Sequence, residues 1–357
     1  MRPAWAEVDL DAVAQNAATL RAVASPARLC AVVKADGYGH GAVPVAQASL
    51  AGGADLLAVA RVAGGVELRR AGIEAELDAT VYAEEAIADL AAAAVRAGRD
   101  AQHPVGVHLK VDTGMHRVGA QPADALALAK AIDADPALAL RSVFTHCAVA
   151  DEPDSTFTAT QLDRFDAVLA ELQAAGLAVA CTHAANTAAA IDHPDARRSL
   201  VRVGIGLYGI APAPALEGRV ALRPALSLHA RVSHVKRVAA GEGISYGLRY
   251  RPERDTTIAT VPLGYADGVP RRLGEVGGAV LIGGRRCPIA GSITMDQVMV
   301  DCGDAEVEVG DEVVLIGRQG EDEVTATDWA DALGTIAYEI VCGISLRVPR
   351  RYLGGPS

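Results

Sequence analysis

The chain has 357 residues, of which 51% are hydrophobic, and it carries a formal net charge of −11 at pH 7. This length exceeds the usual size of one hydrophobic core and therefore predicts two domains. The acidic balance argues against nucleic-acid binding, because no basic stripe is available to neutralise phosphates. No segment is apolar over the length of a membrane span and no apolar signal core opens the chain, so we expect a cytoplasmic protein without membrane contact.

Six cysteines are scattered along the chain without any paired C-x-x-C spacing. Such scattering favours reduced, mostly buried thiols over a disulfide framework or a zinc site. We therefore expect neither structural disulfides nor a bound metal.

Short β-rich segments alternate with alanine-rich helical patterns from about residue 28 to about residue 210. This alternation predicts repeated βα units, and hence an α/β fold with a TIM-like parallel (β/α) barrel. The predicted strands are Leu29–Val33, Leu56–Ala60, Ala79–Tyr82, Val105–Val111, Leu140–Cys147, Ala178–His183 and Leu200–Val203. The predicted helices include Val62–Ala71, Glu84–Arg96, Ala123–Ile132 and Thr160–Ala175.

A closed barrel of this type needs eight strands, and the pattern supplies seven. The irregularity lies between the second and third predicted strands, where residues 62–77 hold one helix and a short acidic connector. Either that connector hides a degenerate strand, or one βα unit is missing.

The pattern changes after about residue 222, where segments rich in Val, Ile and Thr alternate with glycine turns. We predict a barrel domain at residues 1–222 and a mostly β domain at residues 223–357, with one helix at Ala326–Leu333. The strands predicted in the second domain are Ser227–Val238, Thr256–Pro262, Ala279–Ile282, Ile293–Val300, Glu312–Ile316 and Ile336–Val348. The opening segment Trp5–Val8 is also strand-like, and we expect it to pair with the β domain.

The segment from Ala31 to Gly41 carries the clearest chemical signal. An apolar strand ends on Lys34, and a glycine-rich turn with Tyr38 follows at once. The chain has four lysines against 29 arginines, so lysine is rare where a positive charge alone would serve. Arginine stays protonated, whereas a partly desolvated lysine can lose its proton and attack an aldehyde. The motif therefore predicts Schiff-base chemistry at Lys34, with a solvated surface lysine as the alternative.

Three further segments carry groups suited to a site. Arg202 stands at a strand end before a turn opened by Gly204, and free N–H groups in such a turn suit a phosphate. His146 and His183 end neighbouring strands, where each alone would be either a packed core residue or a functional one. Tyr246 lies in a glycine-flanked turn of the second domain, as either a packed phenol or a proton-transfer group.

Together these motifs resemble the alanine racemase family, pyridoxal-phosphate enzymes of fold type III, over the range from Trp5 to about Pro349. The matching segments, in the family's order, are Ala31–Gly41, Leu109–Gly119, Thr145–Cys147, His183–Thr187, Arg202–Gly209, Ser245–Gly247, Gly264–Gly268 and Met295–Gln297. The resemblance implies pyridoxal 5'-phosphate as cofactor and the interconversion of L-alanine and D-alanine. It also implies a homodimer with active sites shared between subunits, and a role in supplying D-alanine for peptidoglycan.

The resemblance implies a role for each matched residue. Lys34 would hold the cofactor and act as the base on the D-face of the substrate, and the partner subunit's Tyr246 would act on the L-face. The cofactor-binding residues implied are Lys34, Tyr38, His146, His183, Thr187, Arg202, Gly204 and Ile205, with Arg202 facing the pyridine nitrogen. The substrate-binding residues implied are Arg117, Met295, Tyr265 and Asp296, and Lys110 matches a lysine that is carbamylated in several members.

Two positions depart from the family pattern. The family barrel has a strand and a helix between Gly72 and Asp78, where this chain has only residues 73–77. Deleting a strand from a parallel barrel exposes two strand edges. Leu346 stands where some members place a tyrosine against the phosphate, which would remove one hydrogen bond worth about 1 kcal/mol.

Three other readings stay open. The first is a single-barrel protein that binds pyridoxal phosphate without catalysis, against which the motifs around Tyr246 and Met295 argue. The second is a fold type III decarboxylase, which would have a roomier site and different second-domain motifs. The third is a degenerate, non-catalytic homologue that binds the cofactor but whose shortened barrel no longer positions Lys34.

Overall fold

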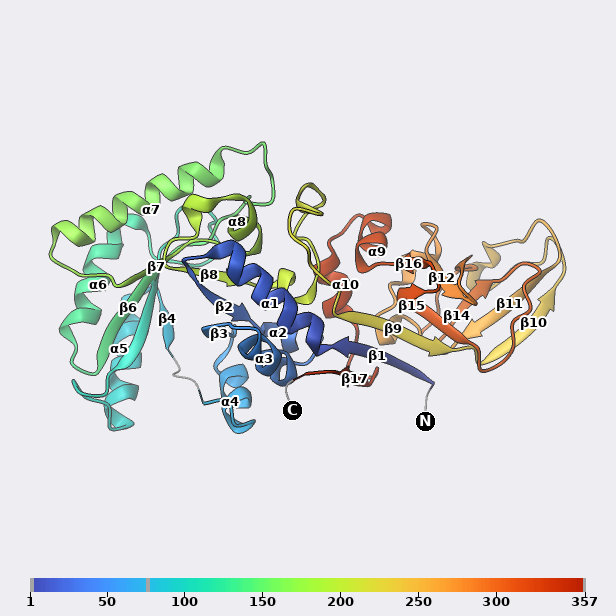
Figure 1. Ribbon diagram of the computed structural model, residues 1–357, viewed down its shortest axis with the longest axis horizontal. Coiled ribbons are helices and arrows are strands. Elements are labelled where there is room, and N and C mark those ends of the chain that lie inside the picture. The colour runs from blue at the N-terminus through green and yellow to red at the C-terminus, as the bar shows by residue number, and fades with distance from the viewer. Residues whose placement is uncertain (1–2, 75–77, 356–357) are drawn as a thin grey trace.

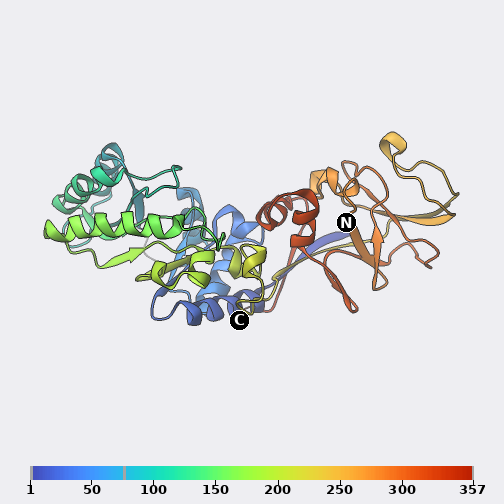
Figure 2. The ribbon, with the colours of Figure 1, turned by 90° about the horizontal axis from the view of Figure 1, so that it is seen from above.

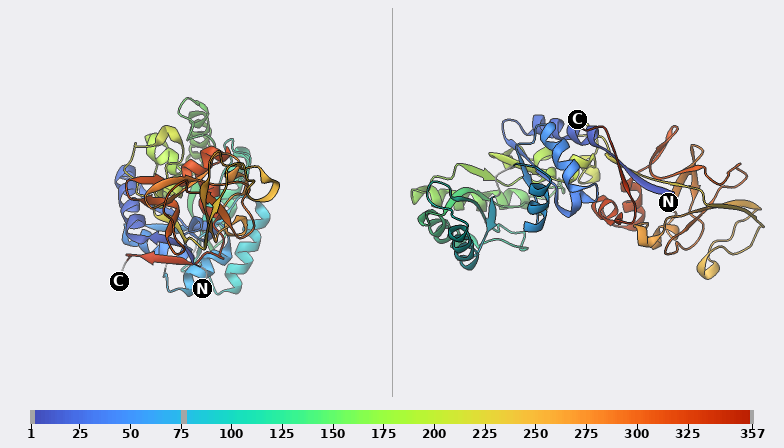
Figure 3. Two further views of the ribbon diagram at one scale, coloured as in Figure 1. Left: turned by 90° about the vertical axis from the view of Figure 1, so that its right-hand side faces the viewer. Right: turned by 90° about the horizontal axis from the view of Figure 1, so that it is seen from below.

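The computed structural model describes residues 3–74 and 78–355 of the chain. Figure 1 shows an elongated molecule in which an α/β part and a mostly β part stand end to end. Figure 2 and Figure 3 show strands from near both termini running between the two parts. These strands are β1 (Ala4–Asp9), β9 (Leu226–Arg231) and β17 (Arg350–Leu353), and β1 pairs with both of the others.

The α/β part is built on a ring of parallel strands. In the described chain these are β2 (Arg28–Val32), β3 (Leu56–Ala58), β4 (Ala79–Val81), β5 (Val105–Lys110), β6 (Leu138–Phe144), β7 (Cys181–His183) and β8 (Leu200–Val203). They form two ladders, in the orders β3-β2-β8 and β4-β5-β6-β7. Backbone hydrogen bonds from Ser199 to Thr182 and from Arg202 to Ala185, each 3.0 Å between N and O, connect β8 with β7. Over the described residues the ring is therefore open at one place, between β3 and β4.

This opening falls where the sequence predicts either a degenerate strand or a missing βα unit. The connection from α4 (Val62–Arg70) to β4 includes Ile73 and Glu74, while residues 75–77 of the predicted connector lie outside the described part. Within the described part, β3 pairs only with β2 and β4 pairs only with β5. A closed barrel needs two neighbours for every strand, so this α/β barrel is short by one strand along the described chain.

Helices cover the outside of the ring (Figure 1). The first, α1 (Leu10–Ala24), begins at Asp9, whose side chain accepts the Ala12 N–H at 2.8 Å. Val13, Ala17 and Leu20 recur every three or four residues and bury one face of this helix. The remaining covering helices of this part are α3 (Ala42–Ala51), α4, α5 (Glu84–Arg96), α6 (Ala125–Ala134), α7 (Phe157–Ala174) and α8 (Thr187–Asp192). The short element α2 (Lys34–Tyr38) has left-handed backbone inside it and lies at the cavity.

The mostly β part contains two sheets. The larger has the order β13-β12-β15-β9-β1-β17 with β16 beside β15, and the smaller has the order β10-β11-β14. Their further strands are β10 (His234–Val238), β11 (Thr256–Val261), β12 (Ala279–Ile282), β13 (Arg285–Pro288), β14 (Val298–Asp301), β15 (Glu312–Gln319) and β16 (Asp322–Val324). Two helices follow, α9 (Ala326–Leu333) and α10 (Ala337–Gly343). One hydrophobic cluster joins Val13 of α1, Leu228 of β9 and Val313 of β15, so the two parts share a core.

The structure corrects three strand predictions in the second part. The segment Ser227–Val238, predicted as one strand, forms β9 and β10, which belong to different sheets. The segment Ile336–Val348, predicted as a strand, contains the helix α10. Its buried residues Ala337, Ile340 and Val341 are three and four positions apart, which puts them on one helical face, and α10 packs against α2. Content of β-branched residues favours a strand, and here the helical spacing overrides it. Of Ile293–Val300, only the last residues belong to a strand.

Most of the other expectations for the fold agree with the observed strands and helices. Each of the seven strands predicted for the barrel overlaps an observed strand, and the helix predicted at Glu84–Arg96 has those bounds. The expected pairing of Trp5–Val8 with the β domain is confirmed, because β1 runs antiparallel to β9. The domain boundary between residues 222 and 223 stays a prediction.

Two expectations from composition also bear on the structure. No helix in the described residues has both the length and the apolar character needed to cross a membrane. All six cysteines have free thiols and five are buried, as their scattered spacing predicts, while Cys342 is exposed.

Asn16 connects α1 with the segments that follow the barrel. Its side chain is fully buried, and its Nδ2 donates to the carbonyl oxygens of Leu207 and Arg223 at 3.0 and 2.8 Å. Its Oδ1 accepts the Arg223 N–H at 2.8 Å. One amide therefore satisfies backbone groups from two segments that no regular ladder would pair.

We expect Asn16→Ala to lower the free energy of unfolding by about 2–3 kcal/mol, because it leaves these backbone groups without their partner. Urea unfolding followed by circular dichroism measures the change. The matched control is Gln173→Ala on α7, where the side chain is exposed and the expected change is within about 0.5 kcal/mol. Equal unfolding free energies for the two variants would contradict the role given to Asn16.

Candidate active site

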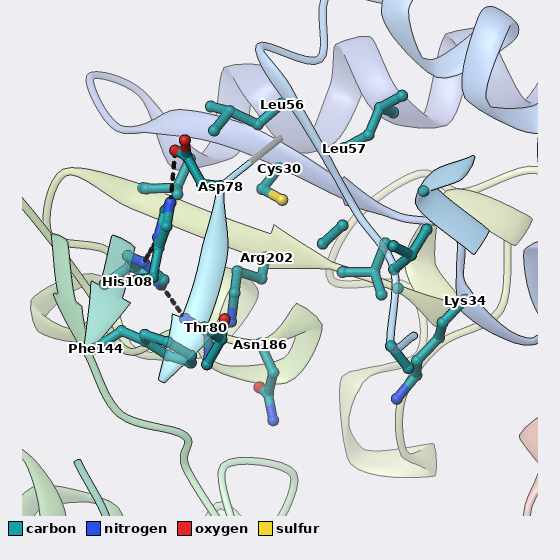
Figure 4. Close-up of a pocket in the computed structure, with 18 of the residues that line it drawn as sticks. Cys30, Lys34, Leu56, Leu57, Asp78, Thr80, His108, Phe144, Asn186 and Arg202 are labelled. Atoms are coloured by element: carbon teal, nitrogen blue, oxygen red, sulfur yellow. Dashed lines mark hydrogen bonds and ion pairs between the residues drawn. The ribbon is translucent and has the colours of Figure 1, made fainter. Parts of the chain in front are cut away.

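A cavity of about 1540 Å³ lies inside the barrel (Figure 4). It reaches from Arg28 and Asp78, at the ends where strands begin, to Lys34 and Arg117, beyond the ends where strands finish. Pockets for small ligands usually measure roughly 300–1,000 Å³, so this cavity includes barrel interior beside the gap. Ten residues predicted for the site line it: Lys34, Tyr38, Lys110, Arg117, His146, His183, Thr187, Arg202, Gly204 and Ile205. We call these ten residues the barrel group.

The other four predicted residues do not line this cavity. Tyr246, Tyr265, Met295 and Asp296, which we call the loop group, lie on loops of the mostly β part. Tyr246 is 74% exposed and Met295 is 54% exposed. The loops are connected, since Ser292 Oγ donates to the Tyr246 carbonyl at 3.0 Å and the backbone N–H of residue 266 donates to the Met295 carbonyl at 3.1 Å. The structure therefore assembles the predicted site residues into two groups on two parts of the chain.

Lys34 lies two residues after the end of β2 and opens a turn with left-handed backbone. The φ angles of Ala35, Asp36 and Tyr38 are 53°, 52° and 52°, a region that costs each non-glycine residue about 1–2 kcal/mol. Asp36 stabilises the turn, because its Oδ1 accepts the Ala42 N–H at 2.8 Å. The turn brings both Lys34 and Tyr38 to the cavity wall.

The surroundings of Lys34 make its ammonium group easier to deprotonate. Partial burial, followed by the charge of Arg117, lowers the pKa of Lys34, and the nearby Cys342 thiol has a smaller opposing effect. A lower pKa leaves a larger share of the amine unprotonated at neutral pH, and the unprotonated amine is the nucleophile. Lys34 is thus suited to forming an imine with an aldehyde that enters the cavity.

Tyr38, Thr187 and Gly204 form a small cradle close to Lys34. A Cβ placed at Gly204 would lie 2.4 Å from the Tyr38 hydroxyl, so only glycine allows the phenol this close. The Gly204 N–H donates to Thr187 Oγ1 at 3.0 Å, which leaves the hydroxyl proton of Thr187 available for another acceptor. Ile205 follows in the short 3-10 helix Ile205–Tyr208. These hydroxyl donors suit a small anion.

Arg202 on β8 is the central cation of the cavity (Figure 4). Its Nη2 donates to the carbonyl oxygens of Thr145 and Ala184 at 2.9 and 3.1 Å and contacts His146 Nδ1 at 2.9 Å. Its Nη1 donates to His183 Nδ1 at 2.6 Å. Burial lowers the pKa of Arg202 to about 10, so the guanidinium remains a cation at neutral pH.

The two histidines beside Arg202 are neutral. Burial, followed by the charge of Arg202, lowers the pKa of His146 to about 2 and lowers the pKa of His183 well below its usual value. A guanidinium has donors only, so the ring nitrogen that faces it must be an unprotonated acceptor. His183 therefore carries its proton on Nε2, the nitrogen that points away from Arg202.

Lys110 ends β5 and leads into the loop that carries Arg117. Burial, followed by the charges of Arg117 and Arg202, lowers the pKa of Lys110 to about 8. Asp112 holds the loop, because its Oδ1 accepts three backbone N–H groups from residues 114–116 at 2.9 to 3.1 Å. The loop thus presents Arg117 to the cavity from an anchored base.

Sequence reasoning missed two cavity residues on α10. Tyr338 and Cys342 line the cavity, and the ring centroids of Tyr338 and Tyr38 are 6.2 Å apart. The two α10 residues are four positions apart, one helical turn, which the strand prediction for this segment concealed.

Three more polar residues lie deeper in the barrel than Arg202. Asp78, His108 and Ser142 form hydrogen bonds that lead back to His183. The sequence could have identified His108 as a cavity residue. It stands two positions before Lys110 in β5, and alternate residues of a strand face the same side. Over the described residues, no group of three or more His, Cys, Asp or Glu side chains could hold a metal ion.

Comparisons with known proteins give a consistent family. Residues 8–212 match the family model described as alanine racemase, N-terminal domain, and residues 225–352 match alanine racemase, C-terminal domain. The curated alanine racemase of Symbiobacterium thermophilum is 50% identical over 370 residues, covering 99% of this chain and 98% of the relative. That of Thermobifida fusca is 46% identical, covering 98% of each chain. The first alignment is longer than this chain, so the relative has residues with no counterpart here.

Solved structures agree with this assignment. The alanine racemase of Streptomyces lavendulae matches with a TM-score of 0.95 and 41% identity, covering 100% of this chain and 98% of that one. The alanine racemase of Bacillus anthracis, solved with bound L-Ala-P, matches with a TM-score of 0.91 and 37% identity, covering 99% and 96%. The fold predicted from the sequence, a barrel domain followed by a β-rich domain, is confirmed.

We expect His146 and His183 to stay unprotonated between about pH 5 and about pH 8, because the lowered pKa of each moves proton uptake below this range. Nitrogen NMR of protein labelled at its histidine rings measures the protonation state. The variants His146→Gln and His183→Gln assign the two signals, and free histidine in the same buffer is the reference. Protonation of either ring within this range would contradict the neutral assignment.

Proposed function

The chain belongs to the alanine racemase family, and we propose that it interconverts L-alanine and D-alanine with pyridoxal 5'-phosphate bound at Lys34. The observation that carries the proposal is the setting of Lys34, an amine of lowered pKa beside a cradle of hydroxyl donors and the cation of Arg202. Free D-alanine made in the cytoplasm would then supply peptidoglycan.

The residues around Lys34 fit this cofactor, which is an aldehyde with a pyridine ring and a phosphate. Lys34 offers the amine for the aldehyde, and the hydroxyls of Tyr38 and Thr187 offer donors to the phosphate. The missing side chain at Gly204 leaves room for the phenol and the backbone to meet at one place. Arg202 would face the pyridine nitrogen, which would accept a hydrogen bond and stay unprotonated because a guanidinium only donates.

Racemisation requires two proton carriers on opposite faces of the substrate α-carbon. The bound cofactor supplies the electron sink that weakens the bond between that carbon and its hydrogen. We assign Lys34 to the D-face and the partner subunit's Tyr246 to the L-face, so that one group removes the proton while the other returns one. The lowered pKa of Lys34 supports its part, because a neutral amine can accept the proton.

The substrate carboxylate would bind Arg117 and the backbone amide of Met295. Arg117 reaches the cavity from the anchored loop, which suits a charge-assisted hydrogen bond to a carboxylate. Asp296 forms an ion pair with Arg347 at 2.6 Å, which would hold the Met295 loop in place. Tyr265 would narrow the entrance and leave room for little more than a methyl side chain.

We propose that the loop group serves the barrel group of a second copy of the chain. Tyr246, Met295 and Tyr265 are exposed although they are large and partly apolar, and exposed apolar groups of this kind often mark interfaces. In a two-fold dimer each subunit would give its loops to the partner and receive the same loops in return. A homodimer would therefore contain two shared sites.

Proton exchange in deuterated water tests the proposed activity. The purified protein is mixed with pyridoxal 5'-phosphate and L-alanine, the loss of the α-proton signal is followed by NMR, and D-alanine is measured by a chiral assay. The expected result is α-deuterated D-alanine.

The open barrel favours one alternative, a homologue that binds the cofactor without catalysis. That protein would bind the cofactor at Lys34, with its characteristic visible absorption, and would exchange no α-proton. Cofactor binding without exchange would therefore reject the racemase proposal and support the alternative.

We expect Lys34→Ala to lose covalent attachment of the cofactor and racemase activity together. We expect Tyr246→Phe to keep the cofactor and to lose activity by about 100-fold or more, since only the phenolic proton is removed. Absorption spectra and racemisation rates measure the two effects. Tyr246→Phe with unchanged activity would reject the assignment of the second proton carrier.

Mixing the two variants tests whether the sites are shared. After co-refolding or co-expression in equal amounts, half of the dimers are mixed, and one site of each mixed dimer has both Lys34 and the partner's Tyr246 intact. We expect recovery of about one quarter of the wild-type activity. Sites contained within single chains would give no recovery.

Lys110 is the proposed site of carbamylation. Carbon dioxide reacts with a neutral amine, and a pKa of about 8 leaves part of Lys110 neutral near pH 7.5. The resulting anion would pair with Arg117. We expect labelled bicarbonate to give a carbamate carbon signal in NMR that is missing in Lys110→Met; the same signal in both proteins would assign it elsewhere.

A further inference from the structure

A chain of hydrogen bonds leads from Arg202 through the barrel interior to Asp78, and Figure 4 shows its last bond, between His108 and Asp78. Arg202 Nη1 lies 2.6 Å from His183 Nδ1, and His183 Nε2 lies 3.0 Å from Ser142 Oγ. Ser142 Oγ lies 2.6 Å from His108 Nδ1, and His108 Nε2 lies 3.0 Å from Asp78 Oδ2. Four strands, β8, β7, β6 and β5, and the residue before β4 each contribute one member.

The chemistry of the two ends fixes the direction of every bond between them. Arg202 can only donate, so His183 Nδ1 accepts and its Nε2 carries the proton that goes to Ser142. Ionised Asp78 can only accept, so His108 Nε2 donates to it and His108 Nδ1 accepts from the Ser142 hydroxyl. Every donor meets an acceptor, and His183 Nε2 also lies 3.3 Å from His108 Nδ1, a second contact with the same donor direction.

Asp78 is ionised, and the fold leaves room for its carboxylate beside His108. The hydrogen bond from His108 lowers the pKa of Asp78, which keeps the carboxylate ionised at neutral pH. Its side chain and that of His108 are 22% and 16% exposed, so water screens the contact only partly. Gly106 on β5 makes room for the carboxylate, because a Cβ there would lie 1.9 Å from Asp78 Oδ1.

We propose that Asp78 is a positioning residue for Arg202, acting through His108, Ser142 and His183. The proposal rests on the proposed function, because its purpose is to keep Arg202 correctly oriented toward the pyridine nitrogen of the cofactor. With the carboxylate present, His108 is held as the tautomer protonated on Nε2. In that tautomer His108 Nδ1 is an acceptor, so the Ser142 hydroxyl donates to it rather than to His183. His183 then keeps its proton on Nε2 and presents an unprotonated Nδ1 to Arg202.

Without Asp78 the opposite direction becomes accessible. His108 could carry its proton on Nδ1 and donate to Ser142, whose hydroxyl would then donate to His183 Nε2. His183 would be left with a proton on Nδ1, opposite an Arg202 N–H that also donates. Two facing donors repel, so Arg202 would lose one of its bonds and its fixed orientation.

Four variants of the full-length holoenzyme separate the possible causes. Asp78→Ala removes both the acceptor and the charge, whereas Asp78→Asn keeps a carbonyl acceptor for His108. Gly106→Ala keeps the charge but displaces the carboxylate from His108. The matched control is Glu74→Gln, which removes a carboxylate from the same cavity wall.

Nitrogen NMR of the histidine rings reads the tautomers directly, and steady-state kinetics reads the consequence. In Asp78→Ala and Gly106→Ala we expect His108 to gain the form protonated on Nδ1 and kcat to fall by roughly tenfold, as for other groups that orient a reacting group indirectly. Asp78→Asn should recover most of the wild-type tautomer and kcat. Glu74→Gln should match the wild type in both.

Unchanged His108 tautomers in both Asp78→Ala and Gly106→Ala would overturn the proposal, whatever their activity. A loss of kcat in Asp78→Ala that Asp78→Asn does not recover would also overturn it, because the bond to His108 would then not be the cause. These outcomes are distinct from failure of the proposed function. The tautomers are measured without turnover, and absence of racemisation in the wild-type protein would reject the function alone.

Discussion

The guanidinium of Arg202 is the group on which the arrangement of the cavity depends. It brings one donor-only cation to the ends of β6 and β7, where the acceptors are the carbonyl oxygens of Thr145 and Ala184 and the rings of His146 and His183. A cation with these neighbours favours neutral rings, and it favours an unprotonated acceptor on the ring nitrogen that faces it.

The barrel gap lies away from the strands that carry the predicted site residues. The open edges belong to β3 and β4, and none of the predicted site residues is on either strand. The barrel group comes from β2, β5, β6, β7, β8 and the segments that directly follow them, which the two ladders and the β7–β8 hydrogen bonds keep adjacent. A strand lost elsewhere, between β5 and β6 for example, would separate Lys110 from His146.

The sequence was sufficient for features with a local cause. Strand ends that carry Lys34 and Arg202 follow from short apolar runs before a glycine turn, and α5 follows from a helical pattern begun by acidic residues. The sequence was insufficient where contacts between distant segments determine the local structure. The helix of Ala337–Gly343 packs against α2, some 300 residues earlier, which overrides β-branched content, and the bond between Asp78 and His108 joins segments 30 residues apart.

Arginine and lysine side chains predominate among the charged groups of the cavity wall, and their mutual repulsion makes the cavity suited to anions. Lys34, Lys110, Arg117 and Arg202 all line it, and the pKa values of both lysines are lowered partly by the neighbouring arginines. Anions relieve that repulsion, so their binding is favourable before any specific contact forms. The relief has a second consequence, because a bound phosphate would raise the pKa of a nearby lysine again and reduce its share of neutral amine. Under the proposed function, Lys34 would escape this limit once its nitrogen held the cofactor, whereas Lys110 would escape it only by becoming an anion itself.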